Sequence, residues 1–358
     1  MKKIRNLLRK SRFLSLLYYG LHIDDFIFSN GWFGFDSSIK SAMLKYLSPK
    51  ELEDERFVKK IRKDIINCYR RYKCLPSEFF LFNFRNLTDY EKSTYVTDTY
   101  INSTLTQVVG RKSHDKQLND KWNFYCLMKP YFKRKVFRVD NKTDYDSFKK
   151  FVLEVKHIIA KPNDESVGSG IRVFHINTVD DAKNVFYEIK KPSKVYLLEE
   201  LIIQNKEMAR WNESSVNTVR VSAFLNRNGF FILSSIIRTG RRGSVIDNAG
   251  HGGISAAIDP QTGIIISDGM DKKGLWYKVH PDTGASFYGY QIPHWSDLVA
   301  LTEEIHRTIP NQIYVGWDFA LTDDGWVLIE GNWGQLGSQQ VALGYGLKPQ
   351  FEKYLYAK

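Results

Sequence analysis

Two acidic residues and one amide side chain lie close to a single tight turn in GWDFALTDDGWVLIEGN, residues 316–332. Asp323-Asp324-Gly325 is a turn signal between two runs of alternating polarity. Folding the stretch about the middle residue of this turn sets Asp318 opposite Glu330, and Asn332 falls on the same face. Hard oxygen ligands converging on one sheet face suit Mg²⁺. The spacing predicts a magnesium site, and the alternative is a surface hairpin whose acids are solvated.

The same fold symmetry fixes the rest of the predicted hairpin. It pairs Ala320 with Leu328 and Thr322 with Trp326, and its other face carries a continuous apolar stripe that needs a core. The members of that stripe are Phe319, Leu321, Val327 and Ile329. Like charges directly opposite each other on two strands repel. Two facing acids are therefore expected to need a counterion.

A glycine-rich segment, KPNDESVGSGI at residues 161–171, follows a predicted strand that ends in FVLEVKHIIAKP. A loop containing Gly168, Ser169 and Gly170 can wrap backbone N–H groups around a polyphosphate, with Lys161 as a point charge. The segment is not a Walker A loop, because no Gly-Lys-Ser/Thr follows and no helix opens there. The alternative is an ordinary glycine-rich hairpin.

A third segment, VYLLEELIIQNKE at residues 195–207, begins as an apolar strand and turns acidic at Glu199-Glu200. A strand that leaves the core in this way could offer backbone groups to an adenine edge. Glu207 could accept hydrogen bonds from ribose hydroxyls. The alternative is a buried strand that runs into a solvated loop.

Composition limits the possible classes of protein. A chain of 358 residues that is 43% hydrophobic can bury a large core in two or three subdomains. No run approaches the ~18 apolar residues of a membrane span. Three cysteines without metal-ligand spacing (Cys68, Cys74 and Cys126) favour a reducing cytoplasm. Without zinc-finger spacing or an RNP-like motif, nucleic-acid binding is not expected.

The net charge of +12 is concentrated in residues 1–75, which hold 17 Lys/Arg against 8 Asp/Glu. The first 25 residues read as a basic amphipathic helix and lack the cleavage site of a signal peptide. This region could contact an anionic membrane or another polyanion, or it could be a solvated helical face. Both interpretations stay open on the sequence alone.

The chain divides into a helical beginning and a mixed remainder. Residues 1–110 read mainly as helix, with Ser48 as a candidate N-cap and Pro49 at the first helical position of a helix reaching Tyr72. From residue 111 strands alternate with helices, and turn signals occur at Asn228-Gly229 and Thr262-Gly263. A helix is predicted at 296–310. The fold class is α+β.

These segments together resemble the ATP-grasp superfamily over residues 111–358. Its motifs correspond in order to Asp120-Lys121, to Lys161-Pro162 with its glycine loop, to Glu199 and Glu200, and to Asp318 with Glu330-Gly331-Asn332. A narrower resemblance is to the sugar-transfer-associated ATP-grasp branch, encoded near surface-polysaccharide genes. The residues that carry it are 215–220, 247–253, 280–284, 316–318 and 330–332.

The resemblance implies an ATP-grasp fold in which two α+β subdomains (residues 111–202 and 203–358) clasp ATP after a helical, basic region at 1–110. It implies that Lys121, with Lys129 as a rival, and Lys161 contact the phosphates, and that Gly168 to Gly170 close over them. Glu199, Glu200 and Ile202 would line the adenine pocket, with Glu207 toward ribose. Asp318, Glu330 and Asn332 would bind two Mg²⁺ ions.

The remaining roles are also implied by the resemblance. Arg220 is expected near the transferred phosphate or the acyl phosphate and, with Lys161, to be catalytic; the alternative is that Arg220 forms a structural salt bridge. Arg238, Asn248 and His251 are candidates for the acceptor pocket. His280 either binds substrate or caps the turn of HPDTG, and His294 and His306 are expected to be structural.

The implied activity is ATP-dependent formation of an amide from a carboxylate and an amine through an acyl phosphate. The substrates would be small molecules, namely a surface-sugar precursor or an amino acid, and the enzyme would act in the cytoplasm or at the inner face of the membrane. One alternative is a kinase-like phosphotransferase that uses the same ATP site. Another is a non-catalytic protein that binds nucleotides or polyanions.

Overall fold

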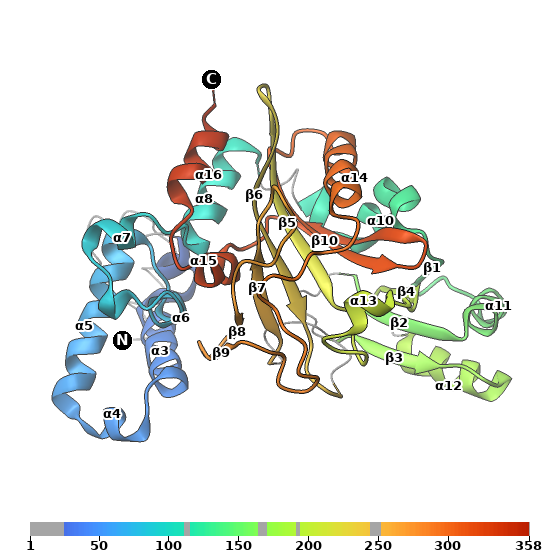
Figure 1. Cartoon of the computed structure of the whole chain (residues 1–358). Helices are drawn as coiled ribbons and strands as arrows, with labels where there is room; N and C mark the ends of the chain where they lie inside the picture. Colours follow the sequence, from blue (N-terminus) through green and yellow to red (C-terminus); the bar gives the residue numbers. More distant parts are fainter. Residues whose placement is uncertain (1–24, 111–114, 164–169, 191–193, 244–251, 358) are drawn as a thin grey trace. The chain divides into compact units, whose positions relative to one another are not determined.

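The computed structural model describes residues 25–110, 115–163, 170–190, 194–243 and 252–357 (Figure 1). The chain forms two compact units, one of Met1–Ser103 with Tyr345–Lys348 and the other of Thr104–Gly344 with Pro349–Lys358. The break falls inside a helix, α8 (Asp98–Val108). The predicted subdomain borders after residues 110 and 202 stay predictions. In the described part of the chain, no helix is both long and apolar enough to cross a bilayer.

The first unit is helical over its described residues, as the sequence predicts. Its elements are α3 (Asp25–Tyr46), α4 (Pro49–Glu53), α5 (Glu55–Tyr72), α6 (Pro76–Leu81), η1 (Phe84–Asn86) and α7 (Asp89–Ser93), followed by the start of α8. Ser48 caps α4 through a reciprocal pair of bonds with Glu51, which confirms the predicted cap. The single helix predicted from Ser48 to Tyr72 is wrong, because Asp54 ends α4 and caps α5 by accepting from two backbone N–H groups.

The second unit contains a four-stranded antiparallel sheet of order β1-β4-β2-β3. Its strands are β1 (Val136–Val139), β2 (His157–Pro162), β3 (Arg172–His175) and β4 (Tyr196–Glu200). Figure 1 shows α11 (Tyr145–Val155) and α12 (Val179–Ile189) beside these strands, and both helices contribute to one apolar core with them. The predicted strand is thus confined to β2, since FVLEV belongs to α11. Lys161 lies at the end of β2, as predicted.

A seven-stranded antiparallel sheet of order β11-β10-β5-β6-β7-β8-β9 makes up most of the rest. Its strands are β5 (Thr218–Asn226), β6 (Gly229–Thr239), β7 (Ile254–Ile258), β8 (Gly269–Asp271), β9 (Trp276–Tyr277), β10 (Tyr314–Thr322) and β11 (Gly325–Asn332). The turn signals at Asn228-Gly229 and at Asp323-Asp324-Gly325 coincide with the β5–β6 and β10–β11 turns. β10 lies between the edge strand β11 and β5, and it is buried along almost its whole length.

Helices flank this large sheet. They are η2 (Asp115–Asn119), α10 (Lys121–Phe132), α13 (Lys206–Ala209), α14 (Trp295–Thr308), α15 (Gly337–Leu343) and α16 (Lys348–Leu355). The predicted helix at 296–310 corresponds to α14, which packs against β5 and β11. α10 packs against β11, and α15 packs against β6 and β7. These helices fix the strands on which the predicted functional residues lie.

Candidate active site

Asp318 on β10 lies directly opposite Glu330 on β11, which confirms that the hairpin brings the two acids face to face. Asn332 is on the same strand as Glu330, and its Nδ2 lies 3.4 Å from Glu330 Oε1. Gly331 between them leaves room for the Trp317 ring, because a Cβ at Gly331 would come within 2.7 Å of that ring. The Glu-Gly-Asn sequence therefore combines two polar side chains with a close packing contact.

The rest of the predicted register is wrong. The two-residue turn pairs Thr322 with Gly325 and Ala320 with Val327, so that neither of the predicted pairs Ala320–Leu328 and Thr322–Trp326 forms. A β-bulge, which begins after the Asp318–Glu330 pair, absorbs one extra residue of β11. The bulge and the shifted turn centre cancel each other at the acids. For that reason the predicted acid pair is correct although the predicted symmetry centre is not.

Two arginines from neighbouring strands hold Asp318. Arg220 lies opposite Asp318 on β5 and contacts both of its oxygens, Nε to Oδ1 at 2.7 Å and Nη2 to Oδ2 at 2.6 Å. Arg238 on β6 adds Nη2 at 2.8 Å from Oδ2. Burial alone would raise the pKa of Asp318, which is 1% exposed, but the two guanidinium groups outweigh burial and hold that pKa well below its usual range. Asp318 is therefore an anion held between two cations.

Glu330 differs from its partner, since its side chain is 49% exposed and the Arg220 Nη2 atom lies 3.8 Å from its Oε1. Desolvation, and then the neighbouring Asp318 carboxylate, raise the pKa of Glu330 above its ordinary value. Within the described ranges no three His, Cys, Asp or Glu residues are grouped as metal ligands, so a metal at this edge would also need the amide of Asn332.

The small sheet carries the second group of charges. Lys161 Nζ lies 2.9 Å from Oε1 of Glu199, and both side chains are largely buried. Arg134, in the segment between α10 and β1, donates to the other oxygen of Glu199 from Nε at 2.9 Å and from Nη2 at 2.6 Å. Burial would raise the pKa of Glu199, but Lys161 and Arg134 lower it to about 2. Two cations against one anion leave this cluster with a net positive charge.

Arg134 also joins the two sheets. Its Nη1 donates to the backbone carbonyl of Leu328 at 2.7 Å, two residues before Glu330, and its guanidinium lies over the Phe132 ring. Arg134 was not predicted from the sequence, because the run Lys133-Arg134-Lys135 reads as ordinary surface charge. The sequence signal that could have indicated its role is its position just before β1, which pairs with the acidic strand β4. The contact links the strand of Lys161 to the strand of Glu330 through buried groups.

Lys121 lies beside the end of the Lys161 strand. It is the first residue of α10, which Asp120 caps, and its Nζ is 3.4 Å from the backbone carbonyl of Asn163. The side-chain carbonyl of Asn163 accepts from the next backbone N–H of the helix. The rival, Lys129, is exposed in the last turn of α10. Of the two lysines, the structure brings Lys121 to the segment where the glycine loop begins.

Several of the predicted site residues lie outside the ranges that the structure describes, or at the ends of those ranges. Gly168, Ser169, Asn248 and His251 are outside them, whereas Gly170 is described and has a positive φ of 70°. Glu200 ends β4 and accepts from the Lys135 backbone, and Ile202 follows it. Glu207 is exposed in α13, where the Tyr290 hydroxyl donates to it at 3.3 Å. The predicted adenine and ribose contacts of these residues stay predictions.

A buried amide pair fixes the entrance to β5. Asn217 donates from Nδ2 to Oε1 of Gln204 and to the backbone carbonyls of Met208 and Asn212. Gln204 in turn donates to the carbonyls of Asn212 and Ser215. From the sequence, Asn217 was recognised only as part of the segment 215–220, and Gln204 was not predicted. Together the two amides hold the chain three residues before Arg220, which helps to position that side chain.

His280 is fully buried in the turn of HPDTG, and both of its ring nitrogens face backbone groups. Nε2 is 3.0 Å from the carbonyl oxygen of Gly240, and the backbone N–H of Asp282 approaches Nδ1 at 3.4 Å. Burial lowers the pKa of His280. The ring therefore acts in the turn as a neutral cap, and a substrate contact stays a prediction. His306 is likewise buried, while His294 is exposed beside Asp297.

Two antiparallel sheets, one with a buried lysine at the end of a strand and the other with facing acids, define an ATP-grasp fold. The sequence matches the family described as sugar-transfer associated ATP-grasp over residues 100–354. This chain belongs to that family. No protein of curated function matches the sequence.

Solved structures with a similar fold include three enzymes. For N5-carboxyaminoimidazole synthase from Aspergillus clavatus, in complex with ADP and a ribonucleotide, the identity is 8%, the coverage 73% of this chain and 58% of that one, and the TM-score 0.45. D-alanyl-alanine synthetase A from Vibrio cholerae is 12% identical, the match covers 70% of this chain and 67% of that one, and the TM-score is 0.41. D-alanine–D-alanine ligase from Bacillus anthracis, complexed with ATP, is 11% identical, the match covers 67% of this chain and 65% of that one, and the TM-score is 0.42. The chain thus spans less than two thirds of the synthase, and the likeness concerns the fold.

Proposed function

We propose that this protein is an ATP-dependent carboxylate–amine ligase that acts in the cytoplasm on a surface-polysaccharide precursor or an amino-acid conjugate. The observation that carries this proposal is the facing pair Asp318 and Glu330, with Arg220 and Arg238 bound to the buried member. A pair of acids at a sheet edge with adjacent guanidinium groups can hold cations and developing negative charge in one place. Transfer of a phosphoryl group requires both.

We assign the phosphate end of ATP to Lys161 of the small sheet and to Lys121 at the start of α10. Lys161 is held by Glu199, and the excess positive charge of its cluster with Arg134 favours an incoming polyanion. Lys121 lies beside the carbonyl of Asn163, close to the end of the same strand. Fixed ammonium groups position the triphosphate and neutralise its charge without reorganisation. Glu199 would therefore not touch the phosphate itself, and its role would be to hold the Lys161 ammonium group in position.

The oxygen atoms on β10 and β11 fit Mg²⁺. A carboxylate has about four acceptor sites, and the guanidinium groups use three of those on Asp318. Glu330 keeps most of its capacity, and Asn332 contributes an amide oxygen. Carboxylate and amide oxygens are ligands that Mg²⁺ accepts alongside phosphate and water. When bound between these residues and ATP, two Mg²⁺ ions would neutralise charge on the triphosphate.

The reaction would proceed in two steps. In the first, a carboxylate oxygen of the acid substrate forms a bond to the γ-phosphorus, and the bond from that phosphorus to the bridging oxygen of ADP breaks. In the second, the amine nitrogen bonds to the acyl carbon, the phosphate leaves with its oxygen, and the nitrogen loses a proton. The Arg220 guanidinium would stabilise negative charge on the phosphoryl oxygens, and Arg238 would help to hold the acid substrate.

Trapping of the acyl phosphate tests the proposal. The purified full chain is incubated with Mg²⁺, ATP and candidate carboxylates, and ADP release is measured with and without candidate amines. Hydroxylamine serves as the general nucleophile, because it converts an acyl phosphate into a hydroxamate. We expect ADP, phosphate and hydroxamate in equal amounts for the correct acid. Glu330→Gln should abolish all three, whereas Glu303→Gln, a surface change in the Glu303–Arg307 pair of α14, should abolish none.

Three other outcomes would overturn the proposal. A stable phosphorylated product, with ADP release that does not depend on any nucleophile, would identify a kinase-like phosphotransferase. ATP turnover by Glu330→Gln at the wild-type rate would remove the acid pair from the chemistry. Absence of turnover in both proteins, together with ATP binding that Glu330→Gln does not change, would favour a non-catalytic nucleotide-binding protein.

A further inference from the structure

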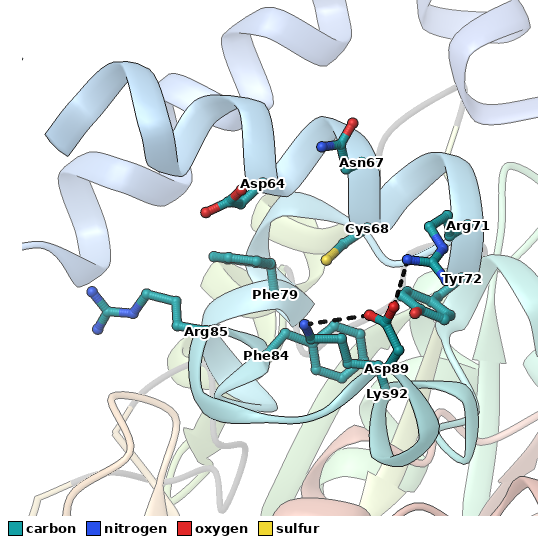
Figure 2. A pocket seen from close by; sticks show the side chains of 10 residues that line it. All are labelled: Asp64, Asn67, Cys68, Arg71, Tyr72, Phe79, Phe84, Arg85, Asp89 and Lys92. Carbon is teal, nitrogen blue, oxygen red and sulfur yellow. Dashed lines mark hydrogen bonds and ion pairs between the residues drawn. The ribbon is translucent and has the colours of Figure 1, made fainter. Parts of the chain in front are cut away.

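A cavity lies wholly within the helical unit, outside residues 100–354 that match the family. It has a volume of about 240 Å³ and is lined by α5, α6, η1 and α7 (Figure 2). This volume is below the ~300–1,000 Å³ of pockets for drug-sized ligands. The cavity therefore suits a small molecule.

The inner wall of the cavity is apolar. Phe79 is 1% exposed, Phe84 is fully buried, and Cys68, which also lines the cavity, is 6% exposed. Burial raises the pKa of Cys68 to about 11, so the sulfur is a neutral thiol at physiological pH. Figure 2 shows the Cys68 sulfur and the two rings facing the same space. A ligand there would place an apolar body against these three side chains.

On the side of the cavity formed by Arg71, Lys92 and Asp89, hydrogen-bond donors outnumber acceptors. Arg71 Nη1 donates to Asp89 Oδ2 at 2.7 Å, while Lys92 Nζ is 3.9 Å from the other oxygen of Asp89, which is too far for a hydrogen bond. The Lys92 side chain is only 17% exposed. An enclosed ammonium group that makes an ion pair but no hydrogen bond to its neighbour lacks most of the solvation it would have in water.

Tyr72 adds a second unsatisfied donor to the same side of the cavity. Its hydroxyl is buried beside the Asp89 carboxylate, but it has no partner at full hydrogen-bond geometry within the described part of the chain. Burial, and then the nearby Asp89 carboxylate, raise its pKa to about 12, so it keeps its proton. A buried hydroxyl without a partner costs free energy and is uncommon in folded proteins. Figure 2 shows the Asp89 carboxylate between Tyr72 and Lys92, and a second acceptor beside that carboxylate would complete the hydrogen bonding of both groups.

We propose that this cavity binds a small organic anion whose carboxylate or phosphate accepts from Lys92 and Tyr72 and whose apolar body packs on Phe79 and Phe84. Two cations share the single carboxylate of Asp89, which leaves one positive charge on that side for the ligand. Figure 2 shows Asp64 on the opposite side of the cavity, away from Arg71. The anionic group is thereby directed to the Lys92 side.

Ligand-observed NMR titration of the full chain tests this site. The probes are benzoate and phenyl phosphate, which separate a carboxylate source from a phosphate source, and benzamide, which has the same ring without the charge. We expect one or both anions to bind at least tenfold more tightly than benzamide. Lys92→Gln should weaken anion binding about ten- to a hundredfold, the range expected for a lost hydrogen bond to a charged group.

Two further variants make the test independent of simple misfolding. Tyr72→Phe removes the unsatisfied hydroxyl, so it should weaken anion binding while leaving the unfolding temperature without probe unchanged or higher. Lys59→Gln on the exposed face of α5 should change neither. The inference is overturned if benzamide binds as tightly as the anions, if no anion binds at about 10 mM, or if Lys92→Gln and Tyr72→Phe bind anions as the wild type does. Loss of ATP turnover in Glu330→Gln would leave these results unaffected.

Discussion

Arg134 provides the sharpest test of how the two sheets are connected. Replacing it by Met keeps much of the side-chain volume and removes the guanidinium that binds Glu199 and the Leu328 carbonyl. Arg134 and Glu199 are each 4% exposed, so the change leaves a buried carboxylate with Lys161 as its remaining ion-pair partner. Removing one member of a buried ion pair costs about 3–5 kcal/mol.

The expected change in thermal stability follows from the size of the second unit. For a domain of this size, 1 kcal/mol corresponds to roughly 2–4 °C in the unfolding midpoint. Arg134→Met should therefore lower the midpoint by about 6–20 °C. Arg134→Lys keeps the charge but loses the two bonds to one oxygen, and it should give a smaller decrease because lysine cannot reproduce the fork of arginine.

The same change should weaken ATP binding. With Arg134 present, the cluster of Arg134, Lys161 and Glu199 has a net charge of +1, and in Arg134→Met it is neutral. We expect the KM for ATP to rise by about tenfold in Arg134→Met, as for the loss of roughly 1.4 kcal/mol of binding energy, and to rise less in Arg134→Lys. Steady-state ADP release at varied ATP concentration gives the KM, and differential scanning calorimetry gives the midpoint.

A double-mutant cycle with Glu199→Gln decides whether the pair itself is responsible. Removing both charges leaves neither partner buried and unpaired, so the double variant should lose at least about 1 kcal/mol less stability than the two single variants combined. If the two losses are additive, or if Arg134→Met lowers the midpoint by less than about 2 °C, the link through Glu199 does not stabilise the unit as we infer.

Three further predictions concern stability. Without Mg²⁺, Glu330→Gln should raise the unfolding temperature, because it relieves the repulsion between the two acids. Asp318→Asn should instead lower stability by about 3–5 kcal/mol, because it leaves two buried guanidinium groups without their anion. Thermal unfolding in EDTA measures both effects, and a loss of stability in both variants would contradict the prediction. His306, whose pKa burial lowers to about 4, stays neutral while the unfolded chain takes up a proton near pH 6.5. Stability should therefore fall by about 3 kcal/mol between pH 6.5 and 4, and the decrease should be shallower in His306→Gln. Gly263→Ala should lower the midpoint much more than Gly274→Ala, since both have positive φ but only at Gly263 would a Cβ come within 2.3 Å of a tryptophan side chain; equal decreases would rule out that clash.

Local sequence signals account for the features that depend on near neighbours. The Asp-Asp-Gly turn and the alternating strands on either side predict a hairpin that brings Asp318 and Glu330 close together, because a hairpin pairs residues only a few positions apart, but their direct pairing also requires the β-bulge. The cap at Ser48 was predictable for the same reason. The bulge in β11 was not, since one extra residue leaves almost no trace in the alternation of polar and apolar positions.

The partners of these residues were decided by the tertiary structure. Arg220 is 98 residues from Asp318, and it reaches that carboxylate because β5 lies between β10 and β6 in the sheet. The sequence indicates that Arg220 lies on a strand but not which strand is its neighbour, because strand order depends on long-range packing rather than on local propensity. Arg134 is the extreme case, since its importance exists only where the edge of one sheet meets a carbonyl of the other. The sequence by itself determined where acids and lysines stand along the strands, and the packing of the sheets decided which charge each of them binds.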